Sequence, residues 1–377
     1  MKIAYDAKRA FNNFTGLGNY SRFIIDGIHR MNEDLLLYTP KITDHTEAEN
    51  FSRKYKSKII QPKGMYGKKL FQSIWRSSKI YHDALDKGAD IFHGLSNELP
   101  SGYSKNTKRI VTIHDLIFIR YPEFYPFIDR KIYMRKFKKA AESADLVIAV
   151  SEQTKSDLIE FLKIDESKIK VNYQGVHSNY HIDISANRIL HLTEKYKLHD
   201  PYFIYVGSIE ERKNALQMVK AFSAYKKENA DETELLIIGK KTDYQAEVEK
   251  EIEKQGMLSY IKIMNKVPFS DLPFLYKGAV ATIYPSSFEG FGIPVLESLT
   301  MRTPVIAGKG SAMEEAGGNH AHYIDPQNLE EFTAAIKQMV ESETFSEQLL
   351  KNLDEHLKQF ESEKLSADLL KLYQSVL

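Results

Sequence analysis

The sequence predicts an α/β protein built from two doubly wound, Rossmann-like domains. Short apolar runs with the length of buried parallel strands alternate with helical segments, and this alternation is typical of βαβ units. The alternation restarts after residue 200, and 377 residues suit two cores of ordinary size. We therefore expect one domain over residues 1–175, a second over 176–360, and an amphipathic helix over 361–377.

In the first half, a strand at Lys2–Tyr5 leads into a loop with Gly16 and Gly18, and an apolar-periodic helix follows. The nucleotide-binding pattern G-x-G-x-x-G is incomplete, because Ser21 stands where its third glycine belongs. Ser151 is typical of a helix N-cap. Residues 177–200 are interpreted as the segment that connects the two domains. Four further buried strands are predicted at Leu35–Tyr38, Asp90–His93, Arg109–His114 and Asp145–Val150.

In the second half, a strand at Tyr202–Val206 is followed by a charged loop over residues 207–214 and by a helix. A further helix is predicted over Asp271–Lys277. The remaining strands of this half are expected at Leu235–Gly239, Ile261–Met264, Ala279–Ile283 and Val305–Ile306.

The stretch from Tyr284 to Pro304 is the most informative part of the chain. Pro285 ends a strand, Gly290 and Gly292 allow a tight turn, and Pro294 suits the first turn of a helix. Free amides at such a helix start attract phosphates. Two carboxylates in the same place, Glu289 and Glu297, would repel a phosphate but would bind neutral hydroxyls beside it. A diphosphate with hydroxyls on both sides is a nucleotide sugar.

Residues 289–297, EGFGIPVLE, resemble the E-x7-E motif of the retaining glycosyltransferases of family 4, and the flanking YPS and TPVI match as well. This resemblance implies the GT-B fold, in which two domains face each other across a cleft and the last helix returns to the first domain. It also implies transfer of a hexosyl group from a nucleotide sugar, bound mostly by the second domain, to an acceptor hydroxyl with retained configuration.

The resemblance also suggests individual roles. Residues 114–126, HDLIFIRYPEFYP, are similar to a segment of family-4 mannosyltransferases, so His114 is expected beside the donor sugar and GDP-mannose is the first choice of donor. His114 also follows a strand, where ligands meet an open α/β sheet. Glu289 and His114 are the predicted catalytic residues. The predicted donor-binding residues are Gly16, Gly18, Ser208, Arg212, Lys213, Val267, Gly290, Phe291, Gly292, Ile293 and Glu297.

The composition limits the kinds of disulfide and metal site that the chain can form, and it indicates the cellular compartment. The chain has no cysteine, so disulfides and thiolate metal sites are excluded and a reducing cytoplasm is expected. It also has no D-x-D motif. We therefore expect no metal and no cofactor, with Arg212 and Lys213 stabilising the leaving diphosphate instead. The residues at the start do not read as a signal peptide.

Charge is distributed unevenly along the chain. Residues 1–180 hold 30 Lys and Arg against 21 Asp and Glu, and the rest hold 22 against 30. The basic stretches 53–80 and 130–139 carry interleaved apolar residues. They indicate either a solvated face over core aromatics or peripheral contact with anionic lipid, on the inner face of the membrane, or with a lipid-linked acceptor. No nucleic-acid motif accompanies them, so the expected partners are a nucleotide sugar and a glycan or lipid-linked acceptor.

Three alternatives to a transferase remain open from the sequence. One is a non-catalytic module that binds a sugar nucleotide, and another is a sugar-nucleotide epimerase of the same fold. The third is an NAD-dependent dehydrogenase, against which the incomplete glycine pattern weighs. Hydrolysis of a nucleotide sugar would separate an enzyme from a binding module.

Overall fold

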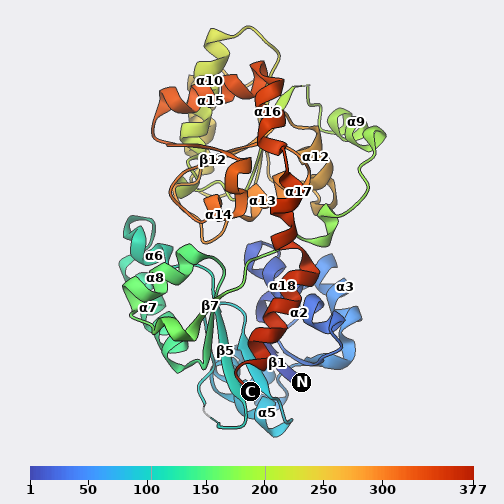
Figure 1. Cartoon of the computed structure of the whole chain (residues 1–377), viewed down its shortest axis with the longest axis vertical. Coiled ribbons are helices and arrows are strands. Elements are labelled where there is room, and N and C mark those ends of the chain that lie inside the picture. Colours follow the sequence, from blue (N-terminus) through green and yellow to red (C-terminus); the bar gives the residue numbers. More distant parts are fainter. Residues whose placement is uncertain (103, 200) are drawn as a thin grey trace. The chain divides into compact units, whose positions relative to one another are not determined.

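The computed structural model describes residues 1–102, 104–199 and 201–377, which form two compact units (Figure 1). Unit 1 comprises Met1–Gly175 together with Gln359–Leu377, and unit 2 comprises Val176–Lys358. Each unit contains its own sheet of parallel strands with helices around it. The predicted α/β class with two doubly wound sheets is therefore confirmed.

The sheet of unit 1 has seven strands in the order β3-β2-β1-β4-β5-β6-β7. The order reverses between β1 and β4, which pair with each other in parallel. The strands are β1 (Lys2–Asp6), β2 (Asp34–Tyr38), β3 (Ile59–Ile60), β4 (Ile91–Gly94), β5 (Lys108–Ile113), β6 (Leu146–Ala149) and β7 (Ile169–Val171). The helices are α1 (Lys8–Asn12), α2 (Gly16–Arg30), α3 (Thr46–Lys54), α4 (Gln72–Ile74), α5 (Ile80–Asp86), α6 (Ile117–Arg120), α7 (Phe127–Ser143), α8 (Glu152–Leu162) and α18 (Ser362–Gln374).

The sheet of unit 2 has six strands in the order β10-β9-β8-β11-β12-β13, with the reversal between β8 and β11. The strands are β8 (Tyr202–Val206), β9 (Glu234–Ile238), β10 (Ile261–Met264), β11 (Ala281–Tyr284), β12 (Val305–Gly308) and β13 (His322–Ile324). The helices are α9 (Ala186–Lys195), α10 (Ala215–Glu228), α11 (Gln245–Lys254), α12 (Leu272–Gly278), α13 (Ile293–Thr300), α14 (Met313–Gly317), α15 (Leu329–Glu341), α16 (Glu343–Leu350) and α17 (Leu353–Leu357).

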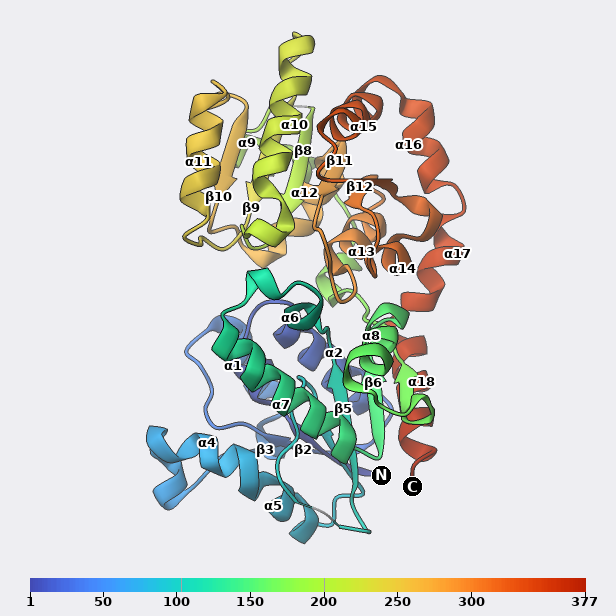
Figure 2. The ribbon, with the colours of Figure 1, turned by 90° about the vertical axis from the view of Figure 1, so that its left-hand side faces the viewer.

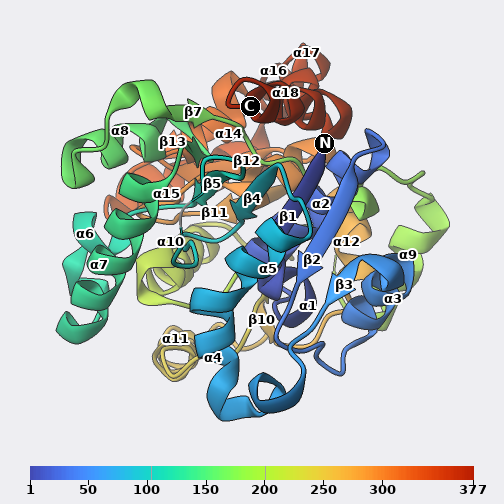
Figure 3. The same cartoon turned by 90° about the horizontal axis from the view of Figure 1, so that it is seen from below.

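The last helix, α18, belongs to unit 1, where it packs against α2. Gly27 of α2 makes this approach possible, because a Cβ atom there would lie only 2.1 Å from the Ser366 hydroxyl oxygen. The two chain ends consequently lie close together in unit 1 (Figure 3). No helix in the described part of the chain is long and apolar enough to span a bilayer.

Local structure departs from the sequence-based expectation in three places. The passage expected over residues 177–200 contains the helix α9, whose Leu192 is fully buried. The short edge strands β3 and β13 were not predicted. The basic stretch 53–80 contains a π-helical segment, Trp75–Lys79, that was not predicted, and Trp75 is buried while Ile74 is 49% exposed.

Candidate functional site

The candidate site in unit 2 is built from two loops at the point where the strand order reverses. One loop follows β8 and the other follows β11, and these two strands pair in parallel. Ligands of open α/β sheets bind outside the carboxyl ends of strands at such a reversal. Ser287 N–H donates to the Arg212 carbonyl across 2.9 Å, so the two loops are joined by their backbones.

The Glu289 carboxylate is the centre of this site. Its Oε1 atom accepts hydrogen bonds from the Ser286 hydroxyl at 2.9 Å and the Tyr284 hydroxyl at 3.0 Å. The same oxygen forms ion pairs with Arg212 Nη1 at 3.0 Å and Lys213 Nζ at 3.5 Å. All of these contacts within the described residues converge on Oε1. The second oxygen, Oε2, is therefore available to accept a hydrogen bond from a ligand.

Charge around Glu289 keeps it ionised. Burial alone would raise the pKa of this carboxyl, but the Coulombic attraction of Arg212 and Lys213 and the hydrogen bond from Ser286 outweigh burial and lower the pKa to about 2. At neutral pH the group is consequently a hydrogen-bond acceptor with no proton to donate.

Asn214, which the sequence did not single out, and the predicted Lys213 hold the two loops in place. Asn214 adopts a left-handed backbone conformation with φ of 53°. The side-chain amide nitrogen of Asn214, Nδ2, donates to the Pro285 carbonyl and the Ser287 hydroxyl, both at 2.8 Å. Lys213 Nζ donates to the Tyr284 hydroxyl at 2.8 Å. Tyr284 belongs to the YPS segment and Asn214 directly follows Lys213 in the sequence, but their pairing across two loops is not visible in either segment.

The predicted donor-binding residues at the start of α13 fall into two groups. Gly292 has φ of 124°, a conformation that L side chains rarely adopt, so glycine is required there for the turn into the helix. Gly290 and Ile293 are partly exposed. Phe291 is only 3% exposed, so its side chain belongs to the core and only its backbone can serve a ligand.

Glu297 lies inside α13 and is buried, with 6% of its surface exposed. The Tyr276 hydroxyl donates to its Oε2 at 3.1 Å, and the Tyr180 hydroxyl lies nearby without hydrogen-bond geometry. Burial raises the pKa of Glu297 to about 7, despite the hydrogen bond from Tyr276. We expected two ionised carboxylates here, whereas Glu297 is substantially protonated at neutral pH. The tyrosines come from distant parts of the chain, so no local pattern could have indicated this.

The remaining predicted residues of unit 2 flank these loops. The carbonyl of Ser208, in the loop after β8, accepts a hydrogen bond from the Tyr205 hydroxyl at 2.8 Å. Val267 is partly buried in the segment that follows β10.

In unit 1, His114 follows β5 and is 5% exposed. Its Nε2 donates to the Leu95 carbonyl at 2.9 Å, which leaves Nδ1 as the acceptor nitrogen of a neutral ring. Burial lowers the pKa of His114 to about 4. The Tyr20 and His114 rings pack in a T-shaped arrangement with their centroids 4.7 Å apart.

The two glycines of the first loop have different environments. A Cβ atom on Gly18 would lie 1.8 Å from the Asn13 carbonyl oxygen, so this glycine is required by the backbone itself. A Cβ atom on Gly16 would meet nothing within 4 Å. Backbone packing therefore accounts for a glycine at position 18 without any ligand, whereas it does not account for the glycine at position 16. Within the described residues, no group of three His, Asp or Glu side chains is arranged to hold a metal ion.

Comparison with known proteins gives two family matches. A model described as "Glycosyl transferases group 1" matches residues 192–359, and one described as "Glycosyltransferase Family 4" matches residues 14–180. Among curated proteins, O-antigen chain mannosyltransferase B of Escherichia coli is 26% identical over 361 residues, 92% of each chain. An O-antigen chain mannosyltransferase of Salmonella typhimurium is 29% identical over 227 residues, which cover 60% of this chain and 59% of that protein.

Solved structures support the same fold. A glycosyltransferase from Rickettsia africae matches with a TM-score of 0.76 and 19% identity, over 100% of this chain and 98% of that one. The Anabaena protein HepE, solved in complex with UDP-glucose, matches with a TM-score of 0.77 and 16% identity over the whole of both chains. At these identities the likeness concerns the fold.

Proposed function

This chain is a mannosyltransferase-like member of glycosyltransferase family 4 with the GT-B fold, and from this premise we propose that it transfers a hexosyl group from a nucleotide sugar to an acceptor hydroxyl with retention of configuration. The names of its curated relatives favour mannose as the sugar, and GDP-mannose is the donor we propose. Assembly of a cell-surface polysaccharide or glycolipid in the cytoplasm is the corresponding role.

The observation that carries this proposal is the cluster of Glu289, Arg212 and Lys213 at the strand reversal of unit 2. The two cations neutralise the donor diphosphate. Glu289 Oε2 accepts a hydrogen bond from a hydroxyl of the transferred sugar. As the diphosphate departs, the same cations stabilise its growing negative charge, so we propose that the reaction needs no metal ion.

We assign a positioning role to His114. Its Nε2–H is used by the Leu95 carbonyl, so Nδ1 is the nitrogen that can accept a hydrogen bond from a sugar hydroxyl. With a pKa of about 4 the ring is neutral at physiological pH. Glu297, largely buried beside Tyr276, serves the ribose end of the donor in this proposal.

The exposed surface of α7 supports a location at the membrane. Phe127 and Ile128 are 62% and 70% exposed, and the basic side chains of Lys131 and Arg135 are exposed beside them, while Arg130 is partly buried. Exposed apolar side chains next to basic ones favour contact with an anionic bilayer. We propose that the protein associates peripherally with the inner face of the membrane, where a lipid-linked acceptor is found.

Donor binding and donor hydrolysis test the proposal directly. A panel of nucleotide sugars is added to the protein in EDTA, and we expect GDP-mannose to raise its melting temperature and to be hydrolysed slowly without acceptor. Lys213→Ala should weaken donor binding in calorimetry by roughly 10- to 100-fold, because a charged hydrogen bond contributes about 1.5–3 kcal/mol. Lys240→Ala, on an exposed loop of the same unit, is the matched control.

The possible results separate the alternatives. Binding of a nucleotide sugar without any turnover would favour the non-catalytic module. A requirement for Mg²⁺ or Mn²⁺ after chelation would contradict the role given to Arg212 and Lys213.

A further inference from the structure

The loop that follows β4, residues 95–98, contacts His114 at two polar atoms. The imidazole Nε2–H of His114 donates to the Leu95 carbonyl at 2.9 Å, and the backbone N–H of His114 donates to the side-chain oxygen of Asn97, Oδ1, at 2.8 Å. Loop and histidine are neighbours because β4 and β5, the strands that precede them, pair in parallel. Sequence patterns did not single out this loop, and the proposed function gives it no role.

Asn97 extends the pairing of the two strands beyond the end of β4. In a parallel ladder, a residue of one strand binds the carbonyl before and the N–H after the residue opposite to it. Asn97 forms this pair of bonds around Ile113. Its N–H donates to the Thr112 carbonyl at 2.9 Å, and its Oδ1 accepts from the His114 N–H. The Asn97 side-chain oxygen therefore replaces the backbone carbonyl that a continued strand would offer.

The backbone of the loop explains why a side chain supplies this acceptor. Asn97 has φ of 62°, in the left-handed region that asparagine tolerates better than most residues, so the chain leaves the direction of β4 there. A Cβ atom on Gly94, at the end of β4, would lie 2.1 Å from the Glu98 carbonyl oxygen, so the loop folds back tightly onto its own start. Since the backbone no longer runs along β5, the Asn97 side chain provides the acceptor for His114.

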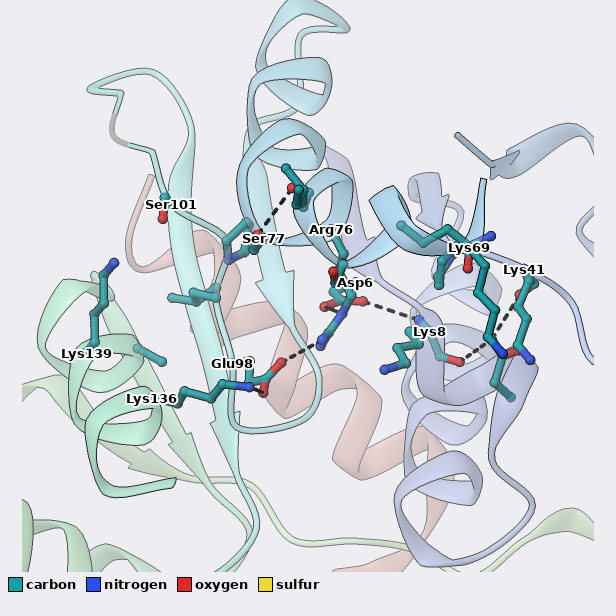
Figure 4. A pocket seen from close by; sticks show the side chains of 18 residues that line it. Asp6, Lys8, Lys41, Lys69, Arg76, Ser77, Glu98, Ser101, Lys136 and Lys139 are labelled. Carbon is teal, nitrogen blue, oxygen red and sulfur yellow. Dashed lines mark hydrogen bonds and ion pairs between the residues drawn. The ribbon is translucent and has the colours of Figure 1, made fainter. Parts of the chain in front are cut away.

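Ion pairs hold the loop at its other end. Glu98 Oε2 lies 2.6 Å from Arg76 Nη1, and Glu98 Oε1 lies 3.0 Å from Lys136 Nζ of α7. Arg76 Nε in turn contacts Asp6 Oδ2, at the end of β1, at 2.7 Å (Figure 4). These groups line a hollow of about 590 Å³, the cationic pocket of unit 1, whose lining also includes Lys8, Lys41, Lys69 and Lys139. Glu98 thus ties the loop to both α7 and β1.

These contacts leave His114 with one polar atom for a ligand. Thr154 Oγ1 donates to the His114 carbonyl at 3.2 Å. Among the described residues, Nδ1 is consequently the one polar atom of His114 without a hydrogen-bond partner. The Leu95 carbonyl needs a donor, so the proton of the neutral ring is on Nε2. The tautomer of His114 thus depends on where the loop places the Leu95 carbonyl.

We propose that the loop of residues 95–98 sets the orientation and the tautomer of His114, and that Asn97 is the positioning residue that holds the loop against the histidine. The proposal rests on the proposed function only for the ligand of Nδ1, a hydroxyl of the transferred sugar. The effect of Asn97 on the imidazole follows from contacts within unit 1 alone. Removing the Asn97 acceptor should therefore change the histidine ring even in the absence of substrate.

Nitrogen chemical shifts of the imidazole ring test this effect. Full-length protein with nitrogen-15-labelled histidine is measured without substrate, and the signals that disappear in His114→Ala are those of His114. We expect a single tautomer, protonated at Nε2, in the wild type and a mixture of tautomers in Asn97→Gly. Glycine removes the acceptor but adopts φ of 62° without strain. Asn32→Gly, at an exposed asparagine that also has φ of 62°, is the matched control and should leave the His114 signals unchanged.

Asn97→Asp gives a second reading, which decides alone if Asn97→Gly does not fold. Its carboxylate keeps an oxygen acceptor for the His114 N–H, so the Nε2 tautomer should persist. The new negative charge beside His114 should raise the pKa of the imidazole, and titration of the same signals measures this rise. An unchanged tautomer in Asn97→Gly would overturn the proposal, and so would loss of the Nε2 tautomer in Asn97→Asp.

A double-mutant cycle tests whether Asn97 acts through His114. Asn97→Gly should lower kcat/KM for sugar transfer about 10- to 100-fold, because displacing a positioning group by about 1 Å has an effect of this size. Asn97→Asp should retain most of the activity. In the His114→Ala background, Asn97→Gly should cause no further loss. Equal losses in both backgrounds would mean that Asn97 supports the fold or meets the substrate itself, and would overturn the proposal.

The spectra and the kinetics together separate this proposal from the proposed function. If the wild-type protein neither transfers nor hydrolyses a nucleotide sugar, but Asn97→Gly yields a mixture of His114 tautomers, the transferase proposal fails and the role of Asn97 stands. If turnover of the donor is normal and His114 keeps one tautomer in Asn97→Gly, the role of Asn97 fails alone.

Discussion

Glu289 and Glu297 lie on one loop and the helix that follows it, yet their pKa values shift in opposite directions. Glu289 faces two cations and its pKa falls to about 2. Glu297 faces tyrosine hydroxyls in the protein interior and its pKa rises to about 7. The environment of each carboxyl, and not its residue type, therefore decides which of them is an anion at neutral pH.

The low pKa of Glu289 bears on the mechanism by which the transferred sugar keeps its anomeric configuration. A double displacement would need this carboxylate as a nucleophile, but a group with so low a pKa and four donors on Oε1 is a weak one. We expect Glu289→Gln to lower kcat roughly 10- to 1000-fold while leaving measurable transfer, since the amide still binds the sugar but no longer stabilises positive charge. Steady-state kinetics measure this, and a glycosyl adduct on Glu289 found by mass spectrometry would contradict it.

The raised pKa of Glu297 makes stability depend on pH. Its pKa of about 7 in the folded state exceeds the ordinary value of 4.5, so the folded protein holds this proton more tightly than the unfolded chain. The resulting stability is fully present below pH 4.5 and is lost as pH rises through 7. Glu297→Gln removes this loss, and we expect it to be more stable than wild type by up to about 3 kcal/mol above pH 8.

Denaturant unfolding of both proteins from pH 5 to pH 9 measures the difference. Glu314→Gln, at an exposed carboxyl, is the control for a general effect of removing charge. A stability difference between Glu297→Gln and wild type that does not change with pH would mean that Glu297 is not the titrating group.

At the scale of elements, α18 is anchored to the sheet of unit 1 by buried hydrogen bonds. The Tyr373 hydroxyl lies 2.6 Å from His93 Nδ1 and 3.2 Å from the Tyr5 hydroxyl. His93 Nε2 continues to Thr112 at 2.9 Å, and Thr112 contacts the Tyr20 hydroxyl at 3.0 Å. The hydrogen-bonded chain ends at Tyr20, whose ring packs on His114, so the last helix of the chain is connected to the candidate histidine through these contacts.

Removing one hydroxyl tests this anchor. Tyr373→Phe keeps the ring but leaves the buried His93 nitrogen without its partner, so we expect a loss of about 1–3 kcal/mol. Thermal unfolding measures the change, and Lys371→Ala, exposed on the same helix, should have almost no effect. Equal melting temperatures for Tyr373→Phe and wild type would show that α18 is held by apolar packing alone.

The central strands and the β11–α13 loop could be predicted from sequence because their signals are local. A buried parallel strand such as β9 is a continuous apolar run, and the loop after β11 carries its own proline and glycines. The two-residue strand β3 is too short for any periodicity. The tyrosines around Glu297 and the Asn214 bridge depend on contacts between distant segments, which one sequence does not contain.

At the scale of the whole molecule, the structure shows where the basic stretches of the first half of the chain lie. The basic stretch 130–139 lies in α7, and the apolar side chains exposed there are Phe127, Ile128 and Ile132. The stretch 53–80 exposes Met65, Leu70 and Ile74. Its helix α4, which ends at Ile74, lies at the outer side of unit 1 (Figure 2). Residues of both stretches line the cationic pocket of unit 1, so its rim carries cations and exposed apolar groups together.

This combination predicts membrane binding that needs both kinds of side chain. Phe127→Ala/Ile128→Ala should reduce binding to vesicles with anionic lipid at least about tenfold, since burying each large apolar side chain contributes roughly 1.5–3 kcal/mol. Arg130→Glu/Lys131→Glu should reduce it further in low salt, because each basic residue near an anionic surface contributes about 1 kcal/mol. Leu190→Ala/Leu258→Ala removes two similarly exposed side chains from unit 2 and should change nothing. Co-sedimentation with vesicles of 30 to 50% anionic lipid, compared with neutral vesicles, measures the binding of all three variants. Equal losses of binding in the α7 and unit 2 variants would mean that the membrane contact does not lie on α7.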